Sequence, residues 1–411
     1  MKGRHVKRFA RFILEQTEGE EAPAGKPLKH LTHVEDHIIH SGNEGVKKAG
    51  EALEGAHETL MGKNSDSHIT TKYDGAPSIV FGHHPKDGRF FVATKAAFNK
   101  APKINYTDHD IEQNHGHAPG LVDKLKTALK HLPKVAPKQG VYQGDVMHTP
   151  EDVHKSGNKL SFTPNTITYH TDADSAHGKA IKHSKFGIVV HTKYEGNGDL
   201  HNMHATPNVD RGKFTHHPDV HNIDPTIKVD PAHYTPKEQQ EYHGAMAKAK
   251  AVYAKMHPDA LDQLKGHATH LEAHVNDMVR KDGTPSTEGY MKHVTERAKK
   301  DIDSVKTEKA KQQKREKLDA TIKHITDNKK HFNHALELHK HLQHAKNVLT
   351  GVMAKNQEFS HTIGGAKTGP EGAVAVTKHG DMSKFVDRKQ FSKQNFLAGK
   401  MQQAKKEAQS K

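Results

Sequence analysis

The chain has 411 residues and contains no cysteine and no tryptophan. The absence of cysteine excludes disulfides, thiolate catalysis and cysteine-ligated zinc, and no run approaches the roughly 18 apolar residues of a membrane span. Lysine and arginine number 63 against 49 aspartate and glutamate residues, a formal net charge of +14. Such a charge favours polyanionic partners, nucleic acid or nucleotides, although general solubility would also account for it.

The segment 1–65 has a helical pattern. A first helix is expected within Met1–Gln16, where the apolar positions share one face: Val6, Phe9, Ile13 and Leu14. Basic residues interrupt this apolar face, unlike the continuous apolar run of a secretory signal, so we expect a cytoplasmic protein. A second helix is expected from a second stripe: Val46, Ala49, Leu53, Ala56 and Leu60.

The segment 66–200 is typical of strands. It consists of short β-branched and aromatic runs bounded by glycine, proline, asparagine or aspartate. These runs are ITTKYDG, SIVFG, RFFVATK, GVYQGDVMH, LSFTPNTITYH and FGIVVHTKY. One helix is expected among them, around Leu121–Leu132. The pattern predicts a mixed, mainly antiparallel α+β domain.

The segment 201–356 is polar and rich in histidine and lysine, and its pattern is helical from about residue 236. Turn signals at His257–Leu261 and Lys281–Gly289 divide it. Its apolar positions follow a heptad only in part. We therefore expect a long helical hairpin with a thin core.

Strand-like runs return in the segment 357–396, at Gly369–Val376 and Ser383–Phe391. The final segment, 397–411, has the composition of a basic, frayed tail.

The tetrapeptide KYDG at Lys72–Gly75 places a lysine in a strand-like run, directly before a turn. A lysine that is near other cations or partly desolvated has a lowered pKa and can act as a nucleophile. It can then attack the α-phosphorus of a nucleoside triphosphate, while the Asp-Gly turn fixes its direction. On its own, the tetrapeptide is better explained as a hairpin turn that exposes a lysine.

Four further segments follow KYDG: Tyr142–Met147, Phe186–Val190, Pro370–Val376 and Ser383–Lys389. In this order, the five segments resemble the motifs of the covalent nucleotidyltransferase superfamily, which comprises ATP-dependent DNA and RNA ligases and mRNA-capping enzymes. The resemblance implies one ligase-type nucleotidyltransferase domain made of 66–200 and 357–396, with 201–356 as a helical insertion. Because the sequence from Phe391 to Lys411 is too short for one, no C-terminal OB-fold is expected, which favours the RNA-ligase-like members.

The resemblance also implies a role for each matched residue. Lys72 would be the nucleophile that becomes adenylylated, and Asp145, in the place of a family glutamate, would contact ribose hydroxyls or metal. Phe186 would stack on the nucleobase, Glu371 would help to hold the metal, and Lys384 would contact the α-phosphate. Further cofactor-binding candidates are Thr71, Asp74, Gly75 and Lys95. The implied cofactors are ATP and Mg²⁺ or Mn²⁺.

The sequence departs from the family pattern at three places. Asp145 is one methylene shorter than glutamate, Val386 stands where a second lysine is usual, and KYDGAP lacks the arginine that commonly follows in DNA ligases. A closer resemblance is to uncharacterised ligase-like proteins of large tailed bacteriophages, which would imply the host cytoplasm. It is carried by four stretches: Leu31–Gly45, KYDGAP, Pro102–Gly116 and Val386–Phe396.

Histidine is unusually frequent, with 39 residues. The stretches Thr215–His221 and His331–His344 suggest zinc or nickel binding, but dispersed histidines on a solvated helix lack the supported geometry of a metal site. A solvated face is the simpler interpretation. The charged run Glu308–Lys317 could follow a phosphate backbone or form an ordinary solvated helix surface.

We therefore expect an ATP-dependent polynucleotide ligase that acts on RNA or nicked duplexes through a lysyl-AMP intermediate, with its helical insertion contacting nucleic acid or a protein partner. The alternative is a catalytically lapsed relative that serves as a nucleic-acid-binding or virion-associated structural protein. Guanylyl transfer to RNA ends is a third hypothesis. The ligase interpretation requires the five segments to converge around one bound nucleotide.

Overall fold

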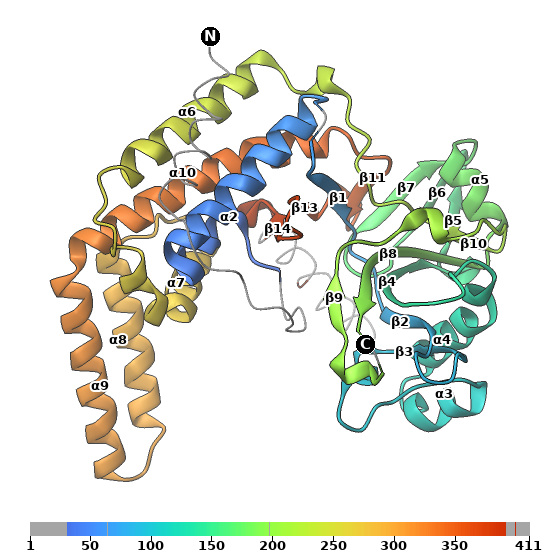
Figure 1. The fold of residues 1–411 in the computed structure, drawn as a ribbon, viewed down its shortest axis with the longest axis horizontal. Coiled ribbons are helices and arrows are strands. Elements are labelled where there is room, and N and C mark those ends of the chain that lie inside the picture. The colour runs from blue at the N-terminus through green and yellow to red at the C-terminus, as the bar shows by residue number, and fades with distance from the viewer. Residues whose placement is uncertain (1–30, 64, 197, 392–398, 400–411) are drawn as a thin grey trace, which may run out of the picture.

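The computed structural model describes residues 31–391 except positions 64 and 197, together with residue 399. It is a mixed α+β structure with a strand-rich half, a helical half and a small sheet between them (Figure 1). None of the described helices is long and apolar enough to cross a membrane. The helix predicted within Met1–Gln16 lies outside the described residues, as does the predicted tail 397–411 apart from residue 399.

The small central sheet joins segments from distant parts of the chain. β1 (His68–Lys72) pairs with β13 (Gly372–Val376), which pairs with β14 (Met382–Phe385), and both pairings are antiparallel. Because successive side chains of a strand point to opposite faces, one face can pack on the helical half while the other lines a site. The face on the helical half buries Ile69, Ala373, Ala375 and Phe385.

A six-stranded sheet forms the body of the strand-rich half. Its order is β10 (Val220–Asn222), β8 (Phe186–Glu195), β4 (Val141–His148), β2 (Ser78–His83) and β3 (Phe90–Ala93), and β9 (His204–Thr206) also pairs with β8. The β10–β8 pairing is parallel and the others are antiparallel. The helices α3 (Asp108–His115) and α4 (Pro119–His131) bury their apolar faces in the same core cluster as this sheet.

A five-stranded antiparallel sheet completes the strand-rich half. Its order is β12 (Ala366–Thr368), β11 (Ser360–Ile363), β7 (Thr168–Asp172), β6 (Lys159–Phe162) and β5 (His154–Ser156). The short helix α5 (Ala176–His183) contributes Ile181 to the core beneath it. Phe359, at the end of the helical segment, enters the same core, so this sheet ties the two halves together.

The helical half is formed by α2 (His37–Leu60), α6 (Pro236–Tyr253), α7 (Ala268–Arg280), α8 (Thr287–Asp303), α9 (Glu308–Asp327) and α10 (Lys329–Ala354). The long helix α10 packs against α6 and α2 and reaches β13 and β14. The α8–α9 hairpin extends away from the body (Figure 1), and α9 buries Ile325 alone among its residues. Short 3₁₀ segments are Val34–Asp36, Lys95–Phe98, Leu132–Lys134, Pro150–Asp152, Leu200–Asn202, Arg211–Lys213, Pro231–His233 and Asp262–His267.

Several sequence predictions are confirmed. The structure is mixed α+β with mainly antiparallel sheets, and the predicted helix around Leu121–Leu132 is α4. All five residues of the predicted second stripe are buried on α2, namely Val46, Ala49, Leu53, Ala56 and Leu60. Of the predicted long hairpin with a thin core, only the part formed by α8 and α9 is observed.

Other predictions need correction. The predicted insertion 201–356 is not purely helical, because β9 and β10 within it belong to the six-stranded sheet. Nor do its helices form an appended hairpin as a whole, since α6 and α10 share one large core cluster with α2 and the central sheet. The strand predicted over Ser383–Phe391 ends at Phe385, and helix begins at Arg388. The helices α3 and α5 were not predicted.

Candidate functional site

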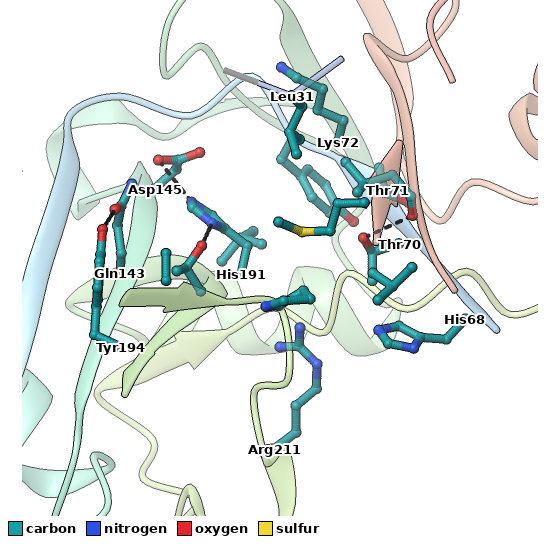
Figure 2. Close-up of a pocket in the computed structure, with 18 of the residues that line it drawn as sticks. Leu31, His68, Thr70, Thr71, Lys72, Gln143, Asp145, His191, Tyr194 and Arg211 are labelled. Atoms are coloured by element: carbon teal, nitrogen blue, oxygen red, sulfur yellow. Dashed lines mark hydrogen bonds and ion pairs between the residues drawn. The ribbon is translucent and has the colours of Figure 1, made fainter. Parts of the chain in front are cut away.

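A cavity of about 270 Å³ lies between the central sheet and the six-stranded sheet, lined in part by Lys72 and Asp145 (Figure 2). Lys95 also lines this cavity. Its size is near the lower end of small-molecule pockets, about 300–1,000 Å³. Its walls come from β1, β4, β8, β13 and β14, with the loop after β9. Four of the sequence-predicted residues, Thr71, Lys72, Lys95 and Asp145, therefore meet at one pocket from three separate segments.

The register of the central sheet explains why Lys384 accompanies Lys72. Lys72 pairs with Gly372, while Thr70 pairs with Val374, which pairs in turn with Lys384. Directly paired residues of adjacent strands present their side chains on the same face, and residues two apart do the same. Lys72, Thr70 and Lys384 thus share the face that lines the pocket, although Lys384 does not reach the cavity wall.

Lys72, the last residue of β1, forms an ion pair with Glu371, the residue before β13. The Glu371 side chain is 10% exposed and that of Lys72 is 31% exposed. Burial raises the pKa of Glu371, the ammonium of Lys72 partly offsets this, and Asp74 and Asp145 add to the rise. The pair therefore holds an amine and a carboxyl group in contact at the pocket, with the carboxyl biased towards accepting a proton.

Asp74 and Gly75 position the chain after Lys72 and do not line the cavity. The Asp74 carboxylate accepts hydrogen bonds from the Asn165 amide (2.7 Å) and from the backbone N–H groups of Thr166 (2.8 Å) and Ile167 (3.0 Å). At Gly75, a Cβ atom would lie 2.6 Å from the Cβ of Asp145. Since real Cβ contacts are never that short, only glycine lets this turn approach β4.

Thr71 and Lys95 both line the cavity. The Thr71 hydroxyl donates to the Gln357 side chain at 3.1 Å, which anchors β1 to the end of the helical segment. Lys95 begins a 3₁₀ segment and is exposed, so its ammonium is available to an anion in the pocket. Burial lowers the pKa of Lys384, and Arg388 lowers it further.

Phe186 does not fit its predicted role as the nucleobase-stacking residue. Its side chain is fully buried in the core under the six-stranded sheet, together with Ile188 and Val190. A ring with no exposed surface cannot stack on a ligand, and the pocket-facing residues of β8 are instead Val189, His191, Thr192 and Tyr194.

Sequence reasoning also missed several polar residues that line the pocket, namely His68, Gln143, His191, Tyr194 and Arg211. Arg211 donates from Nη1 to the carbonyl of Val190 at 2.8 Å and pairs with Asp224 at 3.4 Å. Burial lowers the pKa of Arg211, and Asp224 opposes this. Figure 2 shows Arg211 on the side of the pocket opposite Lys72. Strand alternation could not identify His191, because it and the adjacent Thr192 both line the pocket, and Arg211 begins a short 3₁₀ segment without a sequence signal.

A second cluster of charged groups is buried where the 3₁₀ segment Val34–Asp36, α10 and the chain after β14 meet. Potential ligand atoms of Glu35, Asp36 and His339 lie within 4.8 Å of one another. Lys346 donates to Glu35 at 2.9 Å, and Arg388 pairs with both carboxylates. Two acids are thereby matched by two permanent cations, so we interpret the cluster as a buried ion-pair network rather than a metal site.

Among the described residues, the one group of three potential metal ligands contains a single histidine from these stretches, His339. His331 and His334 are partly exposed on α10, while His339 belongs to the buried network. The alternative interpretation, a solvated face, is wrong for His339 and for His221, which is buried on β10 between His148 and His177.

Comparison with known proteins places the chain in a family of unknown function (DUF6267), whose model matches residues 28–400. The chain belongs to this family. No curated protein and no solved structure matches it.

Proposed function

We propose that this protein is an ATP-dependent nucleotidyltransferase that forms a lysyl-AMP intermediate on Lys72 and joins polynucleotide ends, in RNA or at nicks in a duplex. The observation that carries the proposal is the contact between Lys72 and Glu371 at a pocket that Lys95 and Asp145 also line. Lys384 adds a second cation on the same sheet face. Clustered cations are what an in-line transfer between phosphates requires, because the reaction is driven by positioning and charge neutralisation.

The first step would form a P–N bond. Lys72 gives a proton to Glu371, whose pKa burial raises, and its free amine attacks the α-phosphorus of ATP. The nitrogen loses its second proton to the leaving pyrophosphate as the P–N bond forms. The bond from the α-phosphorus to the bridging oxygen breaks, and pyrophosphate leaves with that electron pair. Lys95 would stabilise the negative charge that develops on the phosphates, and Lys384, on the same sheet face but outside the cavity wall, would add to the positive potential.

Two further transfers would complete end joining. A 5′-phosphate oxygen of the polynucleotide attacks the AMP phosphorus, the P–N bond breaks, and the Lys72 amine recovers a proton. A 3′-hydroxyl then attacks the activated 5′-phosphate, loses its proton, and displaces AMP. Asp145 and Glu371 have the carboxylate oxygens that Mg²⁺ or Mn²⁺ prefers, and such an ion, when bound, would neutralise phosphate charge.

The second candidate function is a catalytically lapsed relative that binds nucleic acid or serves as a virion-associated structural protein. Two observations favour it. The expected base-stacking residue, Phe186, is unavailable, and Val386, at the place of the usual second lysine, is buried at 4% exposure.

Covalent labelling separates the two candidates. Protein stripped of bound AMP is incubated with α-labelled ATP and divalent metal, denatured, and tested for acid-labile label. We expect label in the wild type and none in Lys72→Ala. The matched control is Lys48→Ala, which removes another partly exposed lysine in an ion pair, 3.1 Å from Asp381, and should label normally.

No label at any metal or pH would favour the lapsed relative, whereas label only with GTP would indicate guanylyl transfer. If label forms, a nick-joining panel of RNA, DNA and hybrid duplexes then identifies the substrate.

A further inference from the structure

The strand β8 contains a bulge at the pocket. Gln143 of β4 pairs with Thr192, but the next residue of β4, Gly144, pairs with Val190, so His191 is the extra residue between two paired positions. A bulge of this kind turns consecutive side chains towards the same side and is frequent next to functional sites. His191 and Thr192 consequently both line the pocket.

The bulge brings the imidazole of His191 to the carboxylate of Asp145. The two atoms that face each other, Nε2 of His191 and Oδ1 of Asp145, are 3.4 Å apart (Figure 2). The other ring nitrogen, Nδ1, lies 2.8 Å from the hydroxyl of Thr192. The side chains of His191 and Asp145 remain 36% and 21% exposed, so both are open to the cavity.

The 3.4 Å between Nε2 of His191 and Oδ1 of Asp145 is the separation expected of two ligands of one cation. Donor atoms that bind a divalent ion at about 2.0–2.2 Å lie roughly 3–3.5 Å apart. The hydroxyl of Thr192 can accept the Nδ1–H of His191, which leaves the Nε2 lone pair pointing at Asp145. Metal-binding histidines usually have their second nitrogen fixed in this way.

We propose that Asp145 and His191 form a two-ligand site for a first-row divalent transition ion, of which Mn²⁺ is the probe, in preference to Mg²⁺. Imidazole nitrogen is a good ligand for transition ions, whereas Mg²⁺ prefers oxygen and is reluctant to lose its water. Two protein ligands leave several coordination positions open for water and for phosphate oxygens. The inference that phosphate oxygens of a nucleotide fill these open coordination positions rests on the proposed function, whereas the two protein ligands do not depend on it.

The competing interpretation is a simple ion pair or hydrogen bond in which Nε2–H donates to Asp145 and no metal is involved. The two interpretations differ in what removal of the imidazole does. As an ion pair, His191 competes with metal for Asp145, so its loss would leave Mn²⁺ binding unchanged or tighter. As a ligand, its loss would weaken Mn²⁺ binding and leave Mg²⁺ binding nearly unchanged.

The test measures Mn²⁺ binding directly by electron paramagnetic resonance, with and without a non-hydrolysable ATP analogue and in competition with Mg²⁺. The variants are His191→Asn, His191→Gln and Asp145→Asn in the full chain. The matched control is His204→Asn, which removes a histidine 4.0 Å from Glu195 on the same sheet, outside the cavity. Since the His191 side chain is partly exposed, these substitutions leave no buried hole, and circular dichroism and thermal melting verify folding.

For His191→Asn and His191→Gln we expect at least a tenfold loss of Mn²⁺ affinity with a change in Mg²⁺ affinity of less than about threefold. Asp145→Asn should weaken both ions, and the His204 control should match the wild type. Wild-type Mn²⁺ affinity in both His191 variants, or equal losses for Mn²⁺ and Mg²⁺, would overturn the proposal. Lys72→Ala cannot form lysyl-AMP but keeps both proposed ligands, so it should still bind Mn²⁺. Its Mn²⁺ affinity therefore tests the metal site independently of the proposed activity.

Discussion

Lowering the pH from 8 to 5.5 is expected to destabilise the folded chain strongly, because burial keeps several of its histidines neutral. Burial lowers the pKa of His37, His148 and His361 to about 4 and that of His57 to about 3. All four side chains are at least nine-tenths buried. In the unfolded chain each would have the ordinary value of 6.5.

The sign and size of this change in unfolding free energy follow from proton linkage. A histidine whose pKa is lowered on folding binds its proton preferentially in the unfolded chain, so its contribution is complete above pH 6.5 and declines as the pH falls towards the folded value. At pH 5.5 each of the four costs about 1.4 kcal/mol, and together they cost about 5.6 kcal/mol. This is comparable with the total stability of an ordinary domain, about 5–15 kcal/mol. His40, whose pKa is raised by its hydrogen bond to Glu272, acts in the opposite direction.

The assay is urea unfolding followed by circular dichroism at a series of pH values. His57→Gln removes one of the four groups and should lower the slope of unfolding free energy against pH, below pH 6.5, by about 1.4 kcal/mol per unit. His201→Gln removes an exposed histidine and should leave the slope unchanged. A wild-type unfolding free energy that stays constant between pH 7.5 and 5.5 would refute the reasoning.

Three further predictions concern the buried network, the site and the surface. At pH 8, Lys346→Met should cost about 3–5 kcal/mol of unfolding free energy, because it leaves Glu35 buried with one partner fewer. The control Lys323→Met breaks an exposed pair with Asp327 and should cost less than about 1 kcal/mol. Equal losses in the two variants would contradict the role given to the network. Glu371→Gln should slow lysyl-AMP formation about 10²–10³-fold in single-turnover labelling with an unchanged melting temperature, and an unchanged rate would exclude Glu371 from the proton transfer. Binding of a fluorescent oligonucleotide at matched salt should tighten from pH 8 to pH 6 as the exposed histidines gain charge, and a flat profile in anisotropy titrations would argue against binding through them.

The sequence by itself determined the local elements and the most informative motif. The apolar stripe of α2 was readable because helical periodicity places its residues on one side. The strands could be predicted because short β-branched stretches between turn residues are typical of strands. The order of the motif segments predicted that Lys72 and Asp145 belong together, with Lys95 as a further candidate, and all three line one pocket.

Only the tertiary structure decided which faces and which partners these elements use. The run FGIVV is apolar at nearly every position, so its pattern cannot tell which side faces a core, and Phe186 was therefore assigned to the wrong side. A bulge depends on the register with a neighbouring strand, so the sequence of β8 alone could not place His191 beside Asp145. Likewise the sequence of α10 does not show what covers its apolar residues, and in the folded chain they pack against α6 and against α2, which comes from near the other end of the chain. Local pattern depends on neighbours in sequence, whereas burial and contact depend on segments that only the folded chain brings together.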